Sequence, residues 1–292
     1  MGPTAVGKTA LAIKLARHFK TEIISSDSRQ FFAEMNIGTA KPSIEELNLV
    51  PHHFIGNISI NQKYSAGYFE RDALKKLDEL FVQYDVVVMV GGSGLYIKAL
   101  LEGLDKLPDA DEELRTQLQH IFDTQGIEPL QAQLKNIAPE KFATIDIQNT
   151  QRVMRAIEIA LQPKDTVPKE PRSFKTIKIG LNLDRDILYQ KINNRVDEMI
   201  TNSLEDEVKS LLQYKETYAL QTVGYSEFFD YFENKNSLLK TTELIKQHTR
   251  NFAKRQLTWF KREQDIAWFQ PENWNEIINH IEKKSLSFND KY

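Results

Sequence analysis

The chain opens with a glycine-rich loop, and no other feature limits its possible folds as strongly. Residues 2–9 read GPTAVGKT, which has the spacing G-x-x-x-x-G-K-T. The next residues, ALAIKLARHF, place apolar side chains four apart and predict a helix that leaves the loop directly. In such a loop, backbone N–H groups converge on phosphate oxygens and the helix N-terminus adds favourable partial charge. The alternative is a coincidental glycine turn.

The loop predicts a bound di- or triphosphate, although it does not name the reaction. Lys8 is placed to reach the outer phosphate, and Thr9 to offer its hydroxyl to Mg²⁺, the cofactor that we expect. The predicted phosphate-binding residues of the loop are Gly2, Pro3, Thr4, Ala5, Val6, Gly7, Lys8 and Thr9.

Short apolar runs alternate with amphipathic stretches along the first hundred residues. TEIISSDS and DVVVMVGGSGLY predict strands, and FERDALKKLDELFVQY between them predicts a helix with one broad apolar face. Further on, FKTIKIGLNLD predicts another strand. This alternation predicts an α/β fold: a parallel sheet flanked by helices, like that of P-loop NTPases.

The pattern changes near Leu107. LPDADEELRTQLQHIF predicts a helix capped by Asp109 or Asp111, and helical patterning continues to about Phe142. We therefore expect a core at residues 1–107, a small all-helical insertion at 108–146, and a return to the core with a helical C-terminal part at 147–292. After Asp184 the remaining chain is predicted to be helical.

Composition limits the classes of function. The formal net charge of −3 gives no global reason to expect nucleic acid, so such binding would need local clustering. The 292 residues include no cysteine, which excludes disulfides and thiolate chemistry. No apolar run is long enough to span a membrane, and no signal peptide begins the chain. We expect a cytoplasmic monomer.

Two polar segments follow the first predicted strand. Asp27, in SSDSRQ, lies just past the strand, where ligands bind in open α/β sheets, and is interpreted as a general base, a metal ligand or a helix cap. Thr39 and Lys41, in IGTAKP, carry hydroxyl and ammonium groups suited to phosphate; an ordinary surface loop is the alternative.

Two further segments have both a functional and a structural interpretation. The glycines of VGGSGLY admit either a bulky substrate or a tight strand-to-helix turn, and this strand has an acid only at its beginning, Asp85. Arg152 and Arg155 lie three apart on one helical face, where they suit phosphates, or alternatively a salt bridge with Glu158.

The last feature is a basic segment, IKQHTRNFAKRQLTWFKR, at residues 245–262. It contains no acidic residue, and a helix would align Lys246, Arg250, Lys254 and Lys261 along one side. This pattern predicts contact with a nucleic-acid backbone, with a solvated helix face as the alternative.

Together these segments resemble the tRNA dimethylallyltransferase (isopentenyltransferase) family, in its bacterial form. GPTAVGKT, SSDSRQ, IGTAKP, VGGSGLY, NTQRVMRAIE, QTVGYSEF and TRNFAKRQLTWFKR occur in that family's order, and the resemblance extends from Gly2 to about Trp268. It implies transfer of a dimethylallyl group from its diphosphate to N6 of the adenosine just 3′ of the anticodon in tRNA.

The resemblance also assigns roles to individual residues. It implies that Asp27, with Lys8 and Thr9, is catalytic, that Thr39 and Lys41 join the loop in binding diphosphate, and that residues 108–142 grip the anticodon stem. The implied tRNA-contacting residues are Asp27, Ser28, Arg29, Gln30, Ser93, Gln151, Arg152, Val153, Met154, Arg155, Val223, Gly224, Tyr225, Lys254, Arg255, Gln256, Trp259 and Lys261.

One departure from the family pattern concerns the sheet. Members usually carry roughly six to ten residues before the glycine loop, and these form the strand that positions it; in the printed sequence only Met1 precedes the loop. If the loop has no such support, a central sheet position would be empty, exposing apolar faces and unpaired backbone groups.

Two other classes of function compete with this interpretation. A small-molecule kinase or a prenyltransferase of free adenine nucleotides would explain the loop but leave residues 245–262 without a role. A non-catalytic RNA-binding protein would leave Asp27 without one.

Overall fold

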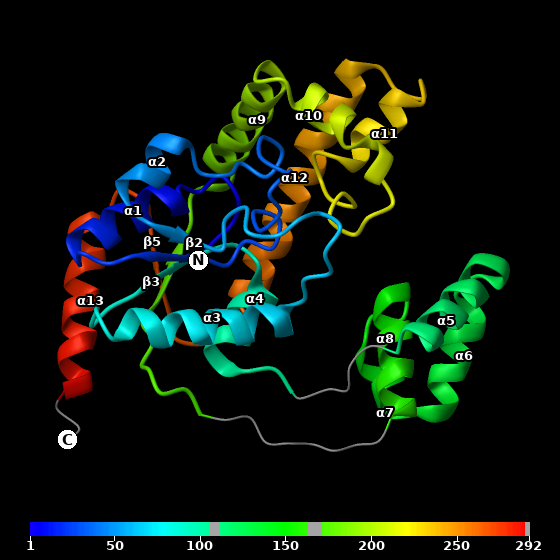
Figure 1. Cartoon of the computed structure of the whole chain (residues 1–292), viewed down its shortest axis with the longest axis horizontal. Helices are drawn as coiled ribbons and strands as arrows, with labels where there is room; N and C mark the ends of the chain where they lie inside the picture. Colours follow the sequence, from blue (N-terminus) through cyan, green and yellow to red (C-terminus); the bar gives the residue numbers. More distant parts are fainter. Residues whose placement is uncertain (106–110, 163–170, 290–292) are drawn as a thin grey trace. The chain divides into compact units, whose positions relative to one another are not determined.

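The computed structural model describes residues 1–105, 111–162 and 171–289. Contacts divide the chain into two units, a core of Met1–Glu102 with Arg172–Tyr292, and a helical unit of Gly103–Pro171. Figure 1 shows both units; each is described here by itself.

The first sheet of the core has three parallel strands in the order β2-β1-β3. They are β1 (Ile23–Ser25), β2 (His52–His53) and β3 (Val88–Val90), and Ile23 pairs with His52 on one side and Val88 on the other. Helix α1 (Lys8–His18) packs against β1 and β3, and α3 (Ala66–Phe81) packs with α4 (Gly94–Glu102) (Figure 1). The predicted strand–helix alternation is confirmed here.

The second sheet pairs β4 (Lys178–Leu181) with β5 (Ile266–Phe269), again in parallel. Strand β5 corrects the expectation that everything after Asp184 is helical. Its four residues follow a long helix, and so short an apolar run also fits the end of a buried helix.

A cavity of about 1070 Å³ lies between β3 and β4 and is lined by residues of both strands and of α1. Met1 borders it and pairs alongside β4: its terminal amino group donates to the Ile179 carbonyl at 2.7 Å, and the Leu181 N–H donates to the Met1 carbonyl at 2.9 Å. Gly2 then crosses so close to β4 that a Cβ would lie 2.5 Å from the Leu181 carbonyl oxygen. Strands β3 and β4 thus line opposite sides of this cavity, called the slot below, and the glycine loop begins directly after Met1 beside it.

Helices dominate the rest of the core. A buried cluster that includes Phe32, Met35, Val208, Tyr225 and Phe228 joins the loops after β1 to the C-terminal helices. These remaining elements are α2 (Ile44–Leu49), α9 (Arg185–Thr201), α10 (Leu204–Ser210), the 3₁₀ helix η1 (Leu212–Tyr214), α11 (Ser226–Phe232), α12 (Leu238–Phe260) and α13 (Trp274–Asn289).

The helical unit contains α5 (Glu112–Gln125), α6 (Glu128–Ile137), α7 (Pro139–Thr144) and α8 (Thr150–Leu161). Asp111 caps α5 through its carboxylate, as predicted, whereas Asp109 lies outside the described residues. The insertion was predicted to end at residue 146. Helix α8 nevertheless belongs to the helical unit, because Val153, Met154 and Ile157 are buried against α5 and α6. The structural boundary therefore falls after α8.

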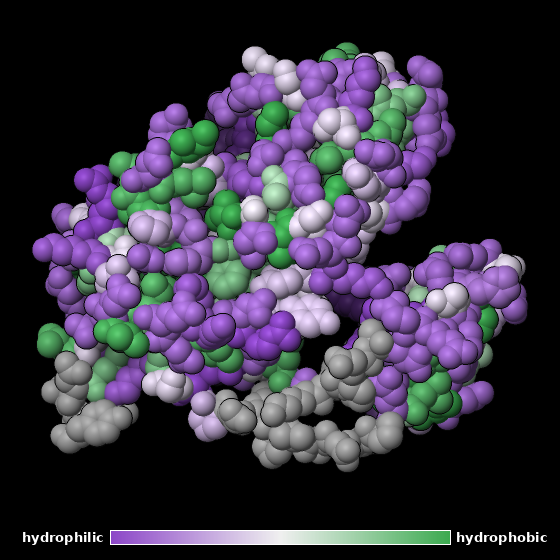
Figure 2. Space-filling view, in the orientation of Figure 1, coloured by the Kyte–Doolittle hydropathy of each residue, from purple (hydrophilic) through white to green (hydrophobic). Residues whose placement is uncertain are grey.

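No helix in the described part of the chain is long and apolar enough to cross a membrane. In the view of Figure 2, hydrophilic residues predominate on the surface and hydrophobic ones are scattered among them.

Candidate functional site

The glycine loop forms a compact turn between the Met1 pairing and α1. Gly7 is the N-terminal boundary residue of the helix, with φ near +97°, and Lys8 begins it. The Lys8 ammonium donates to the Pro3 carbonyl at 2.6 Å, which folds its side chain back over the loop. Backbone N–H groups at the start of α1 have no partner within the helix, so the loop has the chemistry of an anion site.

Electrostatics place Asp27 at this loop. Burial lowers the pKa of the Lys8 ammonium from 10.5 to about 8; the Asp27 carboxylate opposes that shift and the Arg195 guanidinium adds to it. These effects place the three charged groups within electrostatic range of one another. Asp27 follows β1 within that range of the loop, and its catalytic role stays a prediction.

Arg195 is the site residue that sequence reasoning missed. It lies on α9, and its guanidinium donates to the Thr4 hydroxyl at 3.3 Å. Burial lowers its pKa, while the carboxylates of Glu198 and Asp27 raise it. Arg195 is 191 positions from Thr4, and no local spacing on α9 distinguishes it from the other polar residues, so only the folded chain reveals it.

The segment after β1 connects the loop to the glycine turn of VGGSGLY. Asp27 accepts a hydrogen bond from the Arg29 N–H at 3.1 Å, so it also closes a local turn. The Ser28 N–H donates to the Ser93 hydroxyl at 2.9 Å, and the two hydroxyls are 3.1 Å apart. The structure thus brings together Asp27, Ser28 and Ser93, three of the predicted site residues.

Arg29 and Gln30 hold neighbouring segments in place. The Arg29 guanidinium donates to the Tyr218 carbonyl at 2.9 Å and stacks over the Tyr218 ring. The Gln30 side chain donates to the carbonyls of Thr39 and Ala40 at 3.1 and 3.0 Å. Both side chains contact protein groups in this structure, in addition to any role in binding tRNA.

Thr39 and Lys41, which are predicted to bind diphosphate, are both bonded within their own loop. The Thr39 hydroxyl donates to the Met35 carbonyl at 3.0 Å, and the Lys41 ammonium donates to the Phe32 carbonyl at 2.7 Å. Both side chains therefore close their own loop. The Glu207 carboxylate completes this loop by accepting hydrogen bonds from the N–H groups of residues 36–38.

The structure corrects the implied tRNA contact at Tyr225. Its side chain is fully buried, donates to Glu207 at 2.6 Å and packs against Gly38, where a Cβ would lie 2.5 Å from the ring. The Gly224 N–H donates to the Glu227 carboxylate at 2.8 Å. This segment shapes the loop that contains Gly38, and in the structure the Tyr225 ring has no surface to offer a ligand.

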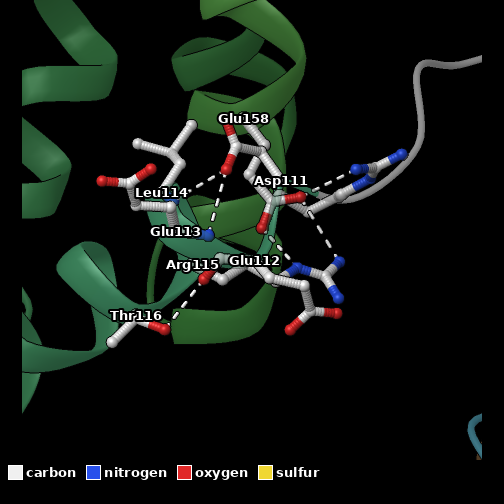
Figure 3. Close-up of polar contacts among 8 residues, drawn as sticks. Asp111, Glu112, Glu113, Leu114, Arg115, Thr116 and Glu158 are labelled. Atoms are coloured by element: carbon white, nitrogen blue, oxygen red, sulfur yellow. Dashed lines mark hydrogen bonds and ion pairs between the residues drawn. The ribbon is translucent and has the colours of Figure 1, made fainter.

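Residues 151–155 divide between surface and core. Gln151 and Arg152 are exposed, whereas Val153 and Met154 are buried in the helical unit and are not available to tRNA. The Arg155 guanidinium donates to the Glu158 carboxylate at 2.7 Å, so the salt-bridge alternative is present. Figure 3 shows Glu158, which also accepts from Arg115 at 2.6 Å and is 1% exposed.

The basic segment lies mainly on α12, and part of its positive charge is paired with other residues. Lys246 is 2.8 Å from Asp197 of α9 and 3.1 Å from Glu243, and Arg250 donates to Asn193 at 2.7 Å. The predicted stripe is thus neutralised at its N-terminal end. At the other end Lys254, Arg255, Trp259 and Lys261 are exposed, whereas Gln256 is buried.

Comparisons with known proteins identify the family. The model of the family described as IPP transferase matches residues 30–263. The chain belongs to the IPP transferase family. It is 50% identical to the tRNA dimethylallyltransferase of Christiangramia forsetii over 291 residues, which cover 97% of this chain and 96% of the relative.

Solved structures agree with this assignment. A tRNA isopentenylpyrophosphate transferase from Bacillus halodurans superimposes with a TM-score of 0.73 at 34% identity, covering 99% of this chain and 95% of the other. A eukaryotic dimethylallyltransferase acting on tRNA shares the fold, with a TM-score of 0.74 at 22% identity, over 99% of this chain and 77% of the other. The resemblance inferred from the sequence motifs is confirmed.

The family also implies Mg²⁺, and the residues at the loop fit it. Thr9 supplies a hydroxyl oxygen in the first turn of α1, beside Lys8. Among the described residues no group of three or more His, Cys, Asp or Glu side chains could hold a metal. Mg²⁺ is commonly held by few protein oxygens together with substrate phosphates, so this sparse donor set suits an ion that binds with a diphosphate.

Proposed function

We propose that this member of the IPP transferase family transfers a dimethylallyl group from dimethylallyl diphosphate to N6 of the adenosine just 3′ of the anticodon in tRNA, releasing diphosphate. The observation that carries the proposal is the position of the Asp27 carboxylate, which follows β1 and lies within electrostatic range of Lys8 and Arg195 at the glycine loop. A carboxylate beside an anion site is suited to accept a proton from a neutral nucleophile that attacks there. The names of the relatives supply the substrate class.

The diphosphate is the leaving group. Loop N–H groups, the Lys8 ammonium and the Arg195 guanidinium surround its oxygens and stabilise the negative charge that develops as the C1–O bond breaks. Thr9 would hold Mg²⁺, which when bound supplies further charge stabilisation on the diphosphate. Because Lys8 is partly buried, its attraction to an anion is screened less than that of a fully exposed lysine.

Asp27 would act on the nucleophile. The exocyclic amine of adenine is weakly nucleophilic, so a carboxylate that accepts one of its protons assists attack on C1. The N6 lone pair forms the new C–N bond, the C1–O electron pair leaves with diphosphate, and the N6 proton passes to Asp27. Ser28 and Ser93, which bond to each other, border the same position and would orient the base.

The exposed end of α12 would bind the tRNA backbone. Lys254, Arg255 and Lys261 supply positive charge, and Trp259 supplies an aromatic face. Gln151 and Arg152 in the helical unit are exposed and remain candidates for tRNA contact. Because the target adenosine lies in a single-stranded loop, it can be unstacked at low cost and enter the site. The proposal places the reaction in the cytoplasm and treats the chain as a monomer.

The test is incubation with labelled dimethylallyl diphosphate and unmodified tRNA, followed by nucleoside analysis. We expect label in N6-dimethylallyladenosine at the position next to the anticodon. Label transferred to free adenine nucleotides but not to tRNA would support the small-molecule alternative. Binding of tRNA without transfer, unchanged in Asp27→Ala, would support a non-catalytic RNA-binding protein.

A further inference from the structure

Gln256 lies in the middle of the basic segment but does not share its surface. Its neighbours Lys254 and Arg255 are exposed, whereas Gln256 is 7% exposed and points to the inside of the core. The motif that contains it implied a tRNA contact. A buried amide requires hydrogen-bond partners inside the protein, and these partners define its role.

Both ends of the Gln256 amide are bonded to segments of the site. Its Oε1 accepts from the Thr4 N–H of the glycine loop at 2.8 Å, and its Nε2 donates to the Gly92 carbonyl at 2.9 Å. The orientation of the amide is fixed by chemistry, because Thr4 offers a donor and Gly92 an acceptor. One side chain on α12 therefore ties the phosphate loop to the glycine turn after β3.

The glycine turn is shaped to receive α12. A Cβ on Gly92 would lie 2.3 Å from Gln256 Nε2, and a Cβ on Gly94 would lie 2.2 Å from Trp259 Nε1. These glycines thus leave space for the Gln256 and Trp259 side chains. The sequence had suggested that this space could instead receive a bulky substrate. The contact between Gln256 and the turn is closely fitted, and Gln256 holds a different atom of Thr4 from Arg195, which binds the Thr4 hydroxyl.

We propose that Gln256 is a positioning residue for the diphosphate loop and not a tRNA contact. This inference rests on the proposed function. Thr4 is held at its N–H by Gln256 and at its hydroxyl by Arg195, so the loop is kept in one conformation before the ligand arrives. A preformed anion site loses less conformational freedom on binding, and its affinity is correspondingly higher.

The first test separates the two substrates. Binding of inorganic diphosphate with Mg²⁺ and binding of unmodified tRNA are measured by calorimetry for the wild type and for Gln256→Ala. We expect the Kd for diphosphate to rise about tenfold, as for loss of a buried hydrogen bond, and the Kd for tRNA to change less than twofold. The KM for dimethylallyl diphosphate should rise in parallel, with that for tRNA unchanged.

Lys254→Ala is the matched control, two residues away on the same helix. Its side chain is exposed, so we expect the opposite pattern: weaker tRNA binding with the diphosphate Kd unchanged. If Gln256→Ala instead followed the pattern of Lys254→Ala, Gln256 would be a tRNA contact and the inference would be overturned.

Gln256→Glu distinguishes positioning from a general loss of stability. An ionised glutamate still accepts from Thr4 but faces the Gly92 carbonyl oxygen without a proton, and it adds negative charge at an anion site. A protonated glutamate restores the donor. We expect the diphosphate affinity of this variant, relative to the wild type, to rise as the pH is lowered from about 8 to about 5.5.

The outcomes are distinct. A wild type that binds no diphosphate would contradict the proposed function itself. A wild type that binds diphosphate, with both Gln256 variants lowering only the melting temperature and leaving the diphosphate Kd unchanged well below it, would reduce Gln256 to an ordinary buried residue and overturn the inference alone.

Discussion

The Asp27 carboxylate lies within electrostatic range of the Lys8 ammonium at the glycine loop, although 19 positions separate the two residues in the sequence. Burial lowers the pKa of Lys8 to about 8, and the Asp27 carboxylate limits that decrease. One site therefore holds an ammonium suited to a diphosphate and a carboxylate suited to an amine. These two roles give different predictions for substitution.

Removing the charge of Asp27 should impair the chemical step more than binding. We expect Asp27→Asn to lower kcat by about 10²–10⁴-fold, because the proton acceptor is lost. The Kd for diphosphate should stay the same or decrease, because a negative charge near the anion is removed. Single-turnover transfer to tRNA and calorimetry measure the two effects. Asp85→Asn, an exposed residue before β3, is the control. Equal losses in binding and kcat would contradict the assigned role.

The pKa of Lys8 predicts how diphosphate binding depends on pH. Below about pH 8 the Lys8 ammonium is charged and adds no pH dependence to the affinity; above it, loss of this charge should lower the affinity by up to tenfold per pH unit. Because diphosphate also titrates, the effect of Lys8 is the difference between the wild type and Lys8→Arg, which stays charged. Calorimetry in buffers of different ionisation enthalpy should detect more proton uptake near pH 8.5 for the wild type than for Lys8→Arg. The same pH dependence in both proteins would contradict the prediction.

The lowered pKa of Lys8 predicts the opposite pH trend for the stability of the ligand-free protein. The unfolded chain, with a Lys8 pKa of 10.5, binds more protons than the folded one between about pH 8 and pH 10.5. In that window the contribution of Lys8 to the free energy of unfolding therefore rises with pH. Diphosphate affinity and this stability contribution should change in opposite directions as pH increases.

The sequence predicted the parts of the site that are local. The glycine loop, the following helix and the polar end of β1 are each contiguous, so Lys8 and Asp27 could be placed from strand and helix patterns alone. Arg195 could not, because the contact with Thr4 spans 191 positions. Strand β5 was missed because four apolar residues after a long helix carry no distinctive period.

A sequence motif identifies a functional segment, but it does not show which of the segment's side chains point to the surface. Gln256 and Tyr225 lie in motifs implied to contact tRNA, yet both are buried, and Val153 and Met154 belong to the core of the helical unit. The basic segment 245–262 contains no acid, yet Lys246 pairs with Glu243 just before the segment and with Asp197 on another helix, which no local pattern reveals. These errors share a cause: the partner of a side chain is set by tertiary packing.

Removing the buried Glu158 carboxylate should lower the stability of the helical unit. Glu158 is 1% exposed and bonds to Arg115 and Arg155, which are themselves partly exposed and can reach water. We expect Glu158→Ala to destabilise the unit by about 1–3 kcal/mol. Hydrogen exchange of α8 amides measures this change. The exposed Glu113→Ala should cost less than about 1 kcal/mol. Equal protection in both variants would show that the Glu158 cluster adds no stability.

Two lysines on α12 should differ in their effect on tRNA binding. Lys254 is exposed, so Lys254→Ala should reduce the slope of log K against log salt by about 1. Lys246 already pairs with Asp197 and Glu243, so Lys246→Ala should leave the slope nearly unchanged. Filter binding to unmodified tRNA at several salt concentrations measures both. Equal slopes for the two variants would contradict the division of the stripe.

The slot between β3 and β4 predicts that an N-terminal extension raises both stability and diphosphate affinity. Extending the protein upstream of Met1 by six to ten apolar, strand-forming residues should continue the pairing of Met1 with β4 and fill part of the 1070 Å³ cavity. Apolar burial and new backbone hydrogen bonds should raise the melting temperature by about 2–4 °C for each kcal/mol gained. The loop that begins at the end of this strand should also bind diphosphate more tightly, because the residues that lead into it are held more firmly.

An extension of equal length with a central proline is the matched control, since proline cannot donate a hydrogen bond to the strand ladder. If the apolar extension raised neither the melting temperature nor the affinity, the slot would not act as a strand position.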